Sequence, residues 1–275
     1  MGFVVQVDGK TYNALQRASD RGFFVVSALF FVASAALTIA WGVSMSAMGG
    51  MPMPGGWTMS MTWMIMPAQT WAGAAASFLG MWNLMMVAMM LPSLTPMLWR
   101  YRQTISCVGE MRMGWLTALA GAGYFLVWTL FGMAAFPLGV VLAEIEMKEP
   151  AVARAVPIAV GIVVLIAGAV QFTAWKARHL ACCREAPGPG RTMAADAGTA
   201  LRHGLRLGLH CSQCCAGLIT ILLVIGVMDL RAMAVVAMAI TVERLAPSSE
   251  RVSRSIGAMA VGAGLFLIAR AVVSG

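Results

Sequence analysis

The chain has 275 residues, of which 60% are hydrophobic and 11% are charged, and its formal net charge at pH 7 is +8. Soluble domains carry about 25% charged residues, so this composition excludes an ordinary soluble domain and predicts a protein embedded in a lipid bilayer. A basic excess is typical of the cytoplasmic loops of membrane proteins. Nucleic acid is therefore not expected as a partner.

Seven apolar segments predict an all-α, polytopic transmembrane helical bundle that forms a single domain over 1–275. The first 22 residues are polar, so we expect no cleavable signal there. The predicted spans are 23–45, 71–92, 115–143, 155–175, 212–228, 232–243 and 255–273.

The basic residues predict the orientation of this bundle. If the N-terminus lies inside, most of the 19 Lys and Arg residues fall on the cytoplasmic side, whereas only Lys148, Arg154 and Arg231 fall outside. Positive residues are retained in cytoplasmic loops during insertion. We therefore expect an inner N-terminus, an outer loop at 45–70 and a basic cytoplasmic segment at 176–211.

The outer loop is rich in methionine, and its Met-x-Met pairs stand among Gly and Pro residues that do not form a packed helix. Thioether sulfurs are soft ligands that select Cu(I) over harder cations, and they need no deprotonation. The loop resembles the copper-collecting segments of membrane copper transporters. The alternative is incidental methionine use. The candidate ligands are Met51, Met53, Met59 and Met61.

A second group of methionines lies in the predicted span 71–92. Met81, Met85 and Met89 repeat at every fourth residue, which places them in one stripe along a helix. Met85 and Met89 are candidate Cu(I) ligands, because an M-x-x-x-M helix resembles that of the trimeric Cu(I) importers. Methionine also packs well in helix bundles, so ordinary core packing explains the same stripe.

Two stretches rich in cysteine and histidine bracket the basic segment. In helices, residues three or four apart share one face, and two such faces would supply four soft ligands for tetrahedral zinc or lower-coordinate Cu(I). The reducing cytosol makes disulfides unexpected. Packing of cysteine as a small apolar residue is the alternative. The candidate ligands are His179, Cys182, Cys183, His210, Cys211, Cys214 and Cys215.

The sequence resembles a bacterial family of predicted metal-binding integral membrane proteins, known as domain of unknown function 2182. Gln171, Thr173 and Cys183 match its pattern, and His179 stands where that family commonly has a cysteine. The resemblance implies metal handling in the bacterial inner membrane, with copper as the usual suggestion and a chaperone-like role. It is carried by "MWNLMMVAMMLPSLTP" at 81–96, "QFTAWKARHLACCR" at 171–184, and 208–245.

Three functions fit these patterns. The first is copper handling, as a chaperone, metallation factor or importer that passes Cu(I) from outer thioethers to inner thiolates and imidazoles, with a membrane or periplasmic protein delivering or receiving the copper. The second is a thiol-based membrane oxidoreductase that uses Cys214–Cys215 or Cys182–Cys183. The third is a structural zinc site in an oligomer or in a subunit of a larger membrane complex. The sequence has no nucleotide-binding motif, and an enzyme is the less favoured of these functions.

Overall fold

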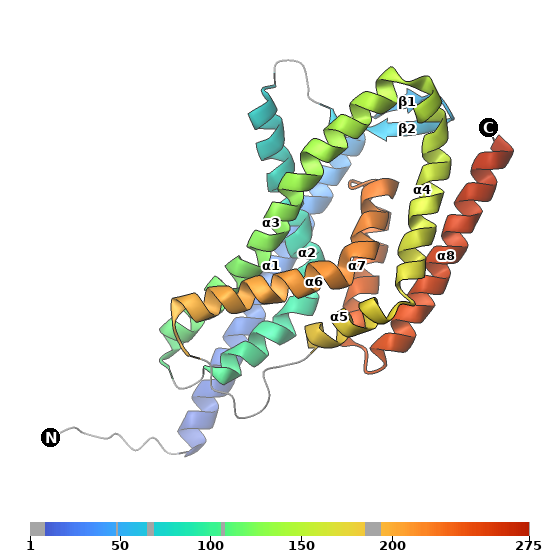
Figure 1. Cartoon of the computed structure of the whole chain (residues 1–275). Coiled ribbons are helices and arrows are strands. Elements are labelled where there is room, and N and C mark those ends of the chain that lie inside the picture. The colour runs from blue at the N-terminus through green and yellow to red at the C-terminus, as the bar shows by residue number, and fades with distance from the viewer. Residues whose placement is uncertain (1–8, 48, 65–68, 106–107, 185–193, 275) are drawn as a thin grey trace.

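The computed structural model describes residues 9–47, 49–64, 69–105, 108–184 and 194–274. It is a helical bundle with one small β-hairpin on its outside (Figure 1). In chain order the elements are α1 (Gly9–Ala47), β1 (Gly50–Met53), β2 (Trp57–Ser60), a 3-10 turn (Met61–Trp63), α2 (Trp71–Thr104), α3 (Glu110–Lys148), α4 (Pro150–Val170), α5 (Ala174–Arg184), α6 (Ala197–Ile225), α7 (Leu230–Leu245) and α8 (Ser249–Ser274).

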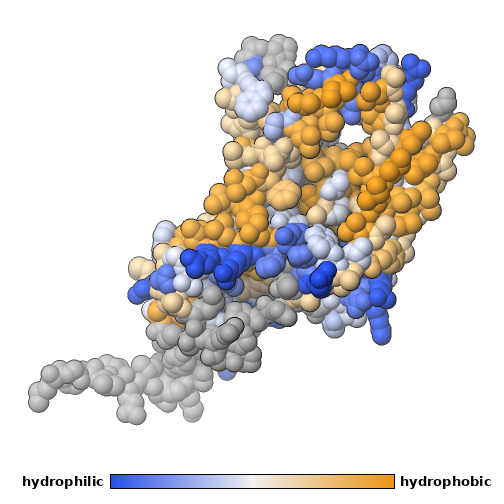
Figure 2. Space-filling model, viewed as in Figure 1, coloured by the Kyte–Doolittle hydropathy of each residue, from blue (hydrophilic) through white to orange (hydrophobic). Residues whose placement is uncertain are grey.

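The helices confirm the prediction of a polytopic membrane bundle. Within the described ranges, six helices are long and apolar enough to cross a membrane, namely α1, α2, α3, α4, α6 and α8. The predicted sixth span forms α7, which has 16 residues and is therefore only about 24 Å long. Figure 2 shows hydrophobic side chains over the middle of the visible face and hydrophilic ones towards its two ends.

The helices alternate in direction, as the sequence predicts for successive spans. The beginning of α1, the helix α5 and the beginning of α8 lie at one end of the bundle (Figure 1). The hairpin, the turn between α3 and α4 and the C-terminal end of α8 lie at the other end. With the predicted inner N-terminus, the first end is the cytoplasmic one.

The helix α6 begins well before the predicted span 212–228 and takes in the second half of the basic segment 176–211. Its early turns are amphipathic, because Arg202 and Arg206 are exposed while Ala200, Gly204 and Gly208 are buried against α3. Hydropathy alone reads such turns as a basic loop, which is why the predicted span begins too late.

Small residues allow α6 and α3 to approach closely. A side chain at Gly204 would collide with the Ala120 carbonyl, and one at Gly208 would lie 2.9 Å from the Tyr124 carbonyl oxygen. Such Gly-x-x-x-Gly spacings are a common way to bring membrane helices into contact. The close approach places the next turn of α6, which begins at Cys211, directly beside Tyr124.

The outer hairpin packs against the junction of α3 and α4. Its strands are antiparallel, with Met51 opposite Met59 and Met53 opposite Trp57. The Trp57 indole Nε1 donates a hydrogen bond of 2.8 Å to the Ala153 carbonyl oxygen. This tertiary bond holds the hairpin, formed by β1 and β2, against the bundle.

Candidate metal centre

Three buried cysteines of α6 form the centre of the candidate site. Cys211 and Cys215 are fully buried, and Cys214 is 2% exposed. Because α6 begins at Ala197, these thiols lie in the middle of the helix. The partial positive charge of a helix N-terminus, which lowers the pKa of nearby thiols, is therefore too far away to act on Cys214 or Cys215.

The Cys211 sulfur has close polar contacts from three elements. The Tyr124 hydroxyl of α3 donates a hydrogen bond of 3.0 Å to it, and the Arg244 Nη1 of α7 donates another of 3.0 Å. The Cys215 sulfur lies 3.8 Å away, one helical turn further along α6. Two donors directed at one sulfur stabilise negative charge on it, and a charged sulfur is the form that binds metal.

A thioether of α2 lies on the other side of the same arginine. Arg244 Nη2 lies 3.1 Å from the Met97 sulfur, and Nη1 also donates a 3.0 Å hydrogen bond to the Ser93 hydroxyl. Cys211, Ser93 and Met97 are therefore gathered around one buried guanidinium group, although they come from α6 and α2.

The methionine stripe of α2 leads to this point. All five methionines of the stripe and its neighbours are buried, which agrees with core packing: Met81, Met85, Met86, Met89 and Met90. In addition, the row at every fourth residue from Met81 continues through Ser93 to Met97. This inclined row covers about 24 Å along the helix axis.

A buried ion pair supports the cysteine segment from α5. Lys176 Nζ lies 2.8 Å from the Glu243 carboxylate and donates a 2.7 Å hydrogen bond to the Cys214 carbonyl oxygen. Burial by itself lowers the pKa of Lys176, but nearby Cys214 and Glu243 more than offset this and raise the pKa above its ordinary value. The ammonium group therefore stays charged and holds α5 and α7 on α6.

The topology prediction assigns Lys176 and Arg244 to the cytoplasmic basic residues, and it gives no role to the neighbouring Glu243. The structure buries all three side chains, and they surround the cysteines. The missed signal is the Glu243–Arg244 pair at the end of a short apolar helix, because charged residues within apolar segments commonly mark functional sites.

The histidines connect the two predicted halves of the site. The rings of His179 on α5 and His210 on α6 lie 6.4 Å apart, and the His179 ring contacts Trp175 edge-on at 4.6 Å. The Nδ1 atom of each histidine is buried and has no hydrogen-bond partner among the residues that the structure describes. Cys182 and Cys183 lie on the backbone of α5, but their side chains fall outside the described part of the structure.

The structure does not complete a conventional zinc site from the side chains that it describes. Among them, no group of three or more His, Cys, Asp or Glu residues is arranged to hold a metal ion. What is brought together instead is a pair of thiols with a nearby thioether. Such a set suits a soft, low-coordinate ion better than four-coordinate zinc.

The outer methionines share one face of the hairpin. Residues two apart on a strand point to the same side, and the register adds Met59 opposite Met51, so Met51, Met53 and Met59 lie on one face. Met53 and Met59 are buried against α3 and α4, with Trp57 and Trp63 packed beside them. Met61 lies next along the chain, in the 3-10 turn. Three predicted ligands are thus brought together.

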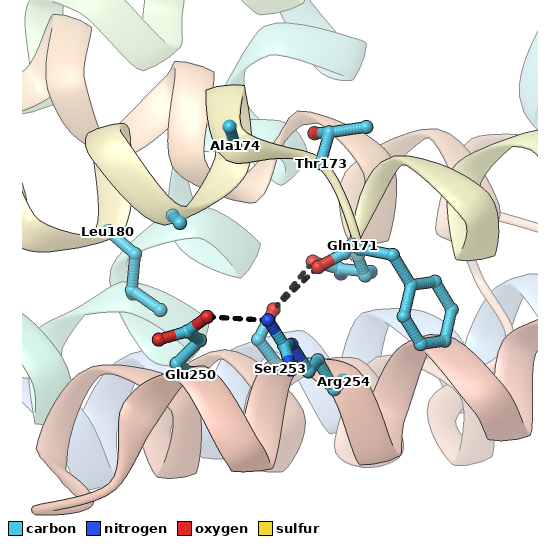
Figure 3. A pocket seen from close by; sticks show the side chains of 9 residues that line it. Gln171, Thr173, Ala174, Leu180, Glu250, Ser253 and Arg254 are labelled. Carbon is cyan, nitrogen blue, oxygen red and sulfur yellow. Dashed lines mark hydrogen bonds and ion pairs between the residues drawn. The ribbon is translucent and has the colours of Figure 1, made fainter.

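A separate cavity of about 240 Å³ lies where α4 ends and α8 begins (Figure 3). The buried Ser253 hydroxyl lies 3.2 Å from the Gln171 side-chain oxygen, and Arg254 pairs with Glu250 at its edge. None of its nine lining residues is a cysteine, methionine or histidine. The cavity therefore offers no soft metal ligand.

Comparisons with known proteins give one match. No curated protein and no solved structure matches the chain. The family model described as "PpoB2: Copper chaperone" matches residues 79–267, which include the α2 row, the α5 and α6 clusters and Arg244. The expectation of a metal-handling membrane family is confirmed, and the chain belongs to the PpoB2 copper chaperone family, with a role in copper handling.

Proposed function

We propose that this protein handles Cu(I) and that the thiols of Cys211 and Cys215 are its central ligands. The observation that supports this most directly is their 3.8 Å separation in the buried core of a copper chaperone family member. The Met97 thioether lies within the same cluster, joined to Cys211 through Arg244. Soft sulfur ligands favour Cu(I) over harder cations.

The outer hairpin is the proposed collecting site. The thioethers of Met51, Met53 and Met59, together with that of Met61 in the adjoining 3-10 turn, bind Cu(I) without losing protons. The α2 row with Met85 and Met89 provides further thioethers on the way to the core. Thiolates bind Cu(I) more tightly than thioethers do. The affinity therefore rises from the hairpin towards Cys211, which gives the transfer its direction.

The inner end is the proposed exit. His179, His210 and Cys214 lie on or beside the face that joins α5 to α6, and Cys182 and Cys183 are the predicted thiols of the same region. Copper would leave from here to a receiving protein, or enter the outer site from a delivering one in the periplasm. We place this activity in the bacterial inner membrane.

The alternative of a structural zinc site has less support from the described side chains. Zinc of this kind needs four ligands, whereas the described cluster has two close thiols, a thioether and an arginine.

Metal analysis of the purified protein tests the proposal. The protein is loaded with Cu(I) under anaerobic conditions in detergent, and its affinity is measured by competition with a chromophoric chelator. We expect one tightly bound Cu(I) in the wild type and its loss in the Cys211→Ser/Cys215→Ser double variant. Cys107→Ser, outside both clusters in the sequence, serves as the control and should bind as the wild type does.

Failure to retain Cu(I) in the wild type, or unchanged retention in the double variant, would contradict this assignment. A matched set of hairpin variants separates the outer step from the inner one. Changing Met51, Met53 and Met59 to Leu should slow copper loading of Cys211 while leaving the final affinity close to that of the wild type. Met259→Leu, on the exposed surface of α8, is the control for methionine loss.

A further inference from the structure

Arg244 lies where the soft ligands of the proposed copper site converge. Its Nη1 is 3.0 Å from the Cys211 sulfur, and its Nη2 is 3.1 Å from the Met97 sulfur. Both nitrogens belong to one rigid, planar guanidinium group. A single buried cation, only 3% exposed, therefore bridges a thiol of α6 and a thioether of α2.

The contacts of Arg244 with the two sulfur atoms occupy lone pairs that would otherwise bind copper. A sulfur accepts a hydrogen bond through a lone pair, and it binds a metal ion through a lone pair as well. Charge adds to the competition, since two cations close together in a poorly polarisable interior repel each other strongly. The guanidinium group and Cu(I) consequently compete for the position between Cys211 and Met97.

Ser93 holds Arg244 in this position. Its hydroxyl accepts the 3.0 Å hydrogen bond from Nη1 and is also bonded to the Met90 carbonyl oxygen at 3.0 Å. A hydroxyl oxygen is a hard ligand that Cu(I) does not favour. Ser93 therefore binds the arginine but not copper. Its hydrogen bond stabilises the state in which Arg244 covers the two sulfur atoms.

The position of Arg244 in α7 allows it to leave. It is the last residue but one of that helix, which ends at Leu245 and passes through a short turn into α8. Helix ends are among the places where local rearrangement is least costly. The lysine and glutamate pair beside it, Lys176 and Glu243, keeps α7 attached to α5 while the arginine side chain moves.

We infer that Arg244 is a cationic lock on the copper site. In the metal-free protein its guanidinium group takes the place of the ion, and Cu(I) binds as Arg244 leaves the two sulfurs. When the arginine returns, it replaces one positive charge with another, so copper leaves without exposing an uncompensated thiolate. This inference rests on the proposed function and adds a release device, which a protein that passes its metal on requires.

Two variants test the lock by competition with a chromophoric Cu(I) chelator. Arg244→Leu removes the guanidinium group and adds no metal ligand. Because the same group stabilises the Cys211 thiolate, the comparison is made at a pH above about 8.5, where a thiol is deprotonated without its help. There the Cu(I) affinity of Arg244→Leu should rise about tenfold, which equals about 1.4 kcal/mol. Ser93→Ala loosens the arginine without touching a copper ligand, and its affinity should rise by a smaller factor. Both variants should also release Cu(I) to excess chelator more slowly than the wild type.

The control is Thr95→Ala, which removes another hydroxyl of α2, one that bonds to the Leu91 carbonyl oxygen. It should bind and release Cu(I) as the wild type does. Wild-type affinity or weaker binding in Ser93→Ala and Arg244→Leu would overturn the lock. If Arg244→Leu does not fold, Ser93→Ala decides the question. A wild type that binds no Cu(I) would instead overturn the proposed function, and the lock with it.

Discussion

Removal of the buried Lys176 ammonium group should strongly lower the stability of the fold. It is buried against the Glu243 carboxylate at 2.8 Å and bonded to the Cys214 carbonyl oxygen. Changing Lys176 to Met leaves a buried carboxylate without its counter-ion, and breaking such a pair costs about 3–5 kcal/mol. We expect a clearly lower midpoint of thermal unfolding in detergent.

The exposed pair of Lys148 with Glu144 is the matched control for this variant. Exposed pairs of this kind contribute little, so Lys148→Met should leave the unfolding midpoint nearly unchanged. Replacing both Lys176 and Glu243 with apolar residues should recover part of the stability lost in Lys176→Met. Equal midpoints for Lys176→Met and Lys148→Met would show that the buried pair does not stabilise the fold.

At the scale of elements, the contact between α3 and α6 determines where the cysteines lie. A methyl group at Gly204 would collide with the Ala120 backbone, so Gly204→Ala must push the two helices apart. Overpacking of this kind costs about 1–3 kcal/mol. Because the shift moves Cys211 away from Tyr124, we expect both lower thermal stability and weaker Cu(I) binding.

The helix α8 offers the control for this substitution. An added Cβ at Gly262 would meet nothing within 4 Å, and alanine is a better helix former than glycine. Gly262→Ala should therefore fold at least as stably as the wild type, with unchanged Cu(I) binding. If Gly204→Ala behaves in the same way, the close approach of α3 and α6 is not needed for the site.

The helices of the bundle could be predicted from local sequence, because apolar content over about 20 residues is enough to recognise a membrane span. The contacts of Cys211 could not be predicted from local sequence. Tyr124 is 87 residues away in the chain and Arg244 is 33 away, and nothing local to either residue indicates the pairing. The histidine and cysteine spacing predicts that these residues lie on helices, as they do in α5 and α6, whereas the topology prediction assigns Arg244 to a cytoplasmic loop and gives no sign of its contact with Cys211.

At the scale of the whole molecule, the positions of the two termini show whether the short helix α7 crosses the membrane. Figure 1 shows the beginning of α1 and the end of α8 at opposite ends of the bundle, as seven passes predict. With the predicted inner N-terminus, the end of α8 then lies outside, whereas six passes would return it to the cytoplasm. Alkaline phosphatase fused after Ser274 should be active in a bacterial host, and the same enzyme fused to the N-terminus should be inactive. The reverse activities would contradict the predicted orientation.

The charged residues at the end of α7 also affect how this helix is inserted into the membrane. This helix has 16 residues and carries Glu243 and Arg244 in its last turn, so by itself it is a poor substrate for the insertion machinery. The ammonium group of Lys176 and the sulfur of Cys211, which satisfy those charges, belong to helices synthesised before it. The residues of the proposed metal site therefore also hold α7 in place, and the helices that carry them are synthesised before α7 needs them.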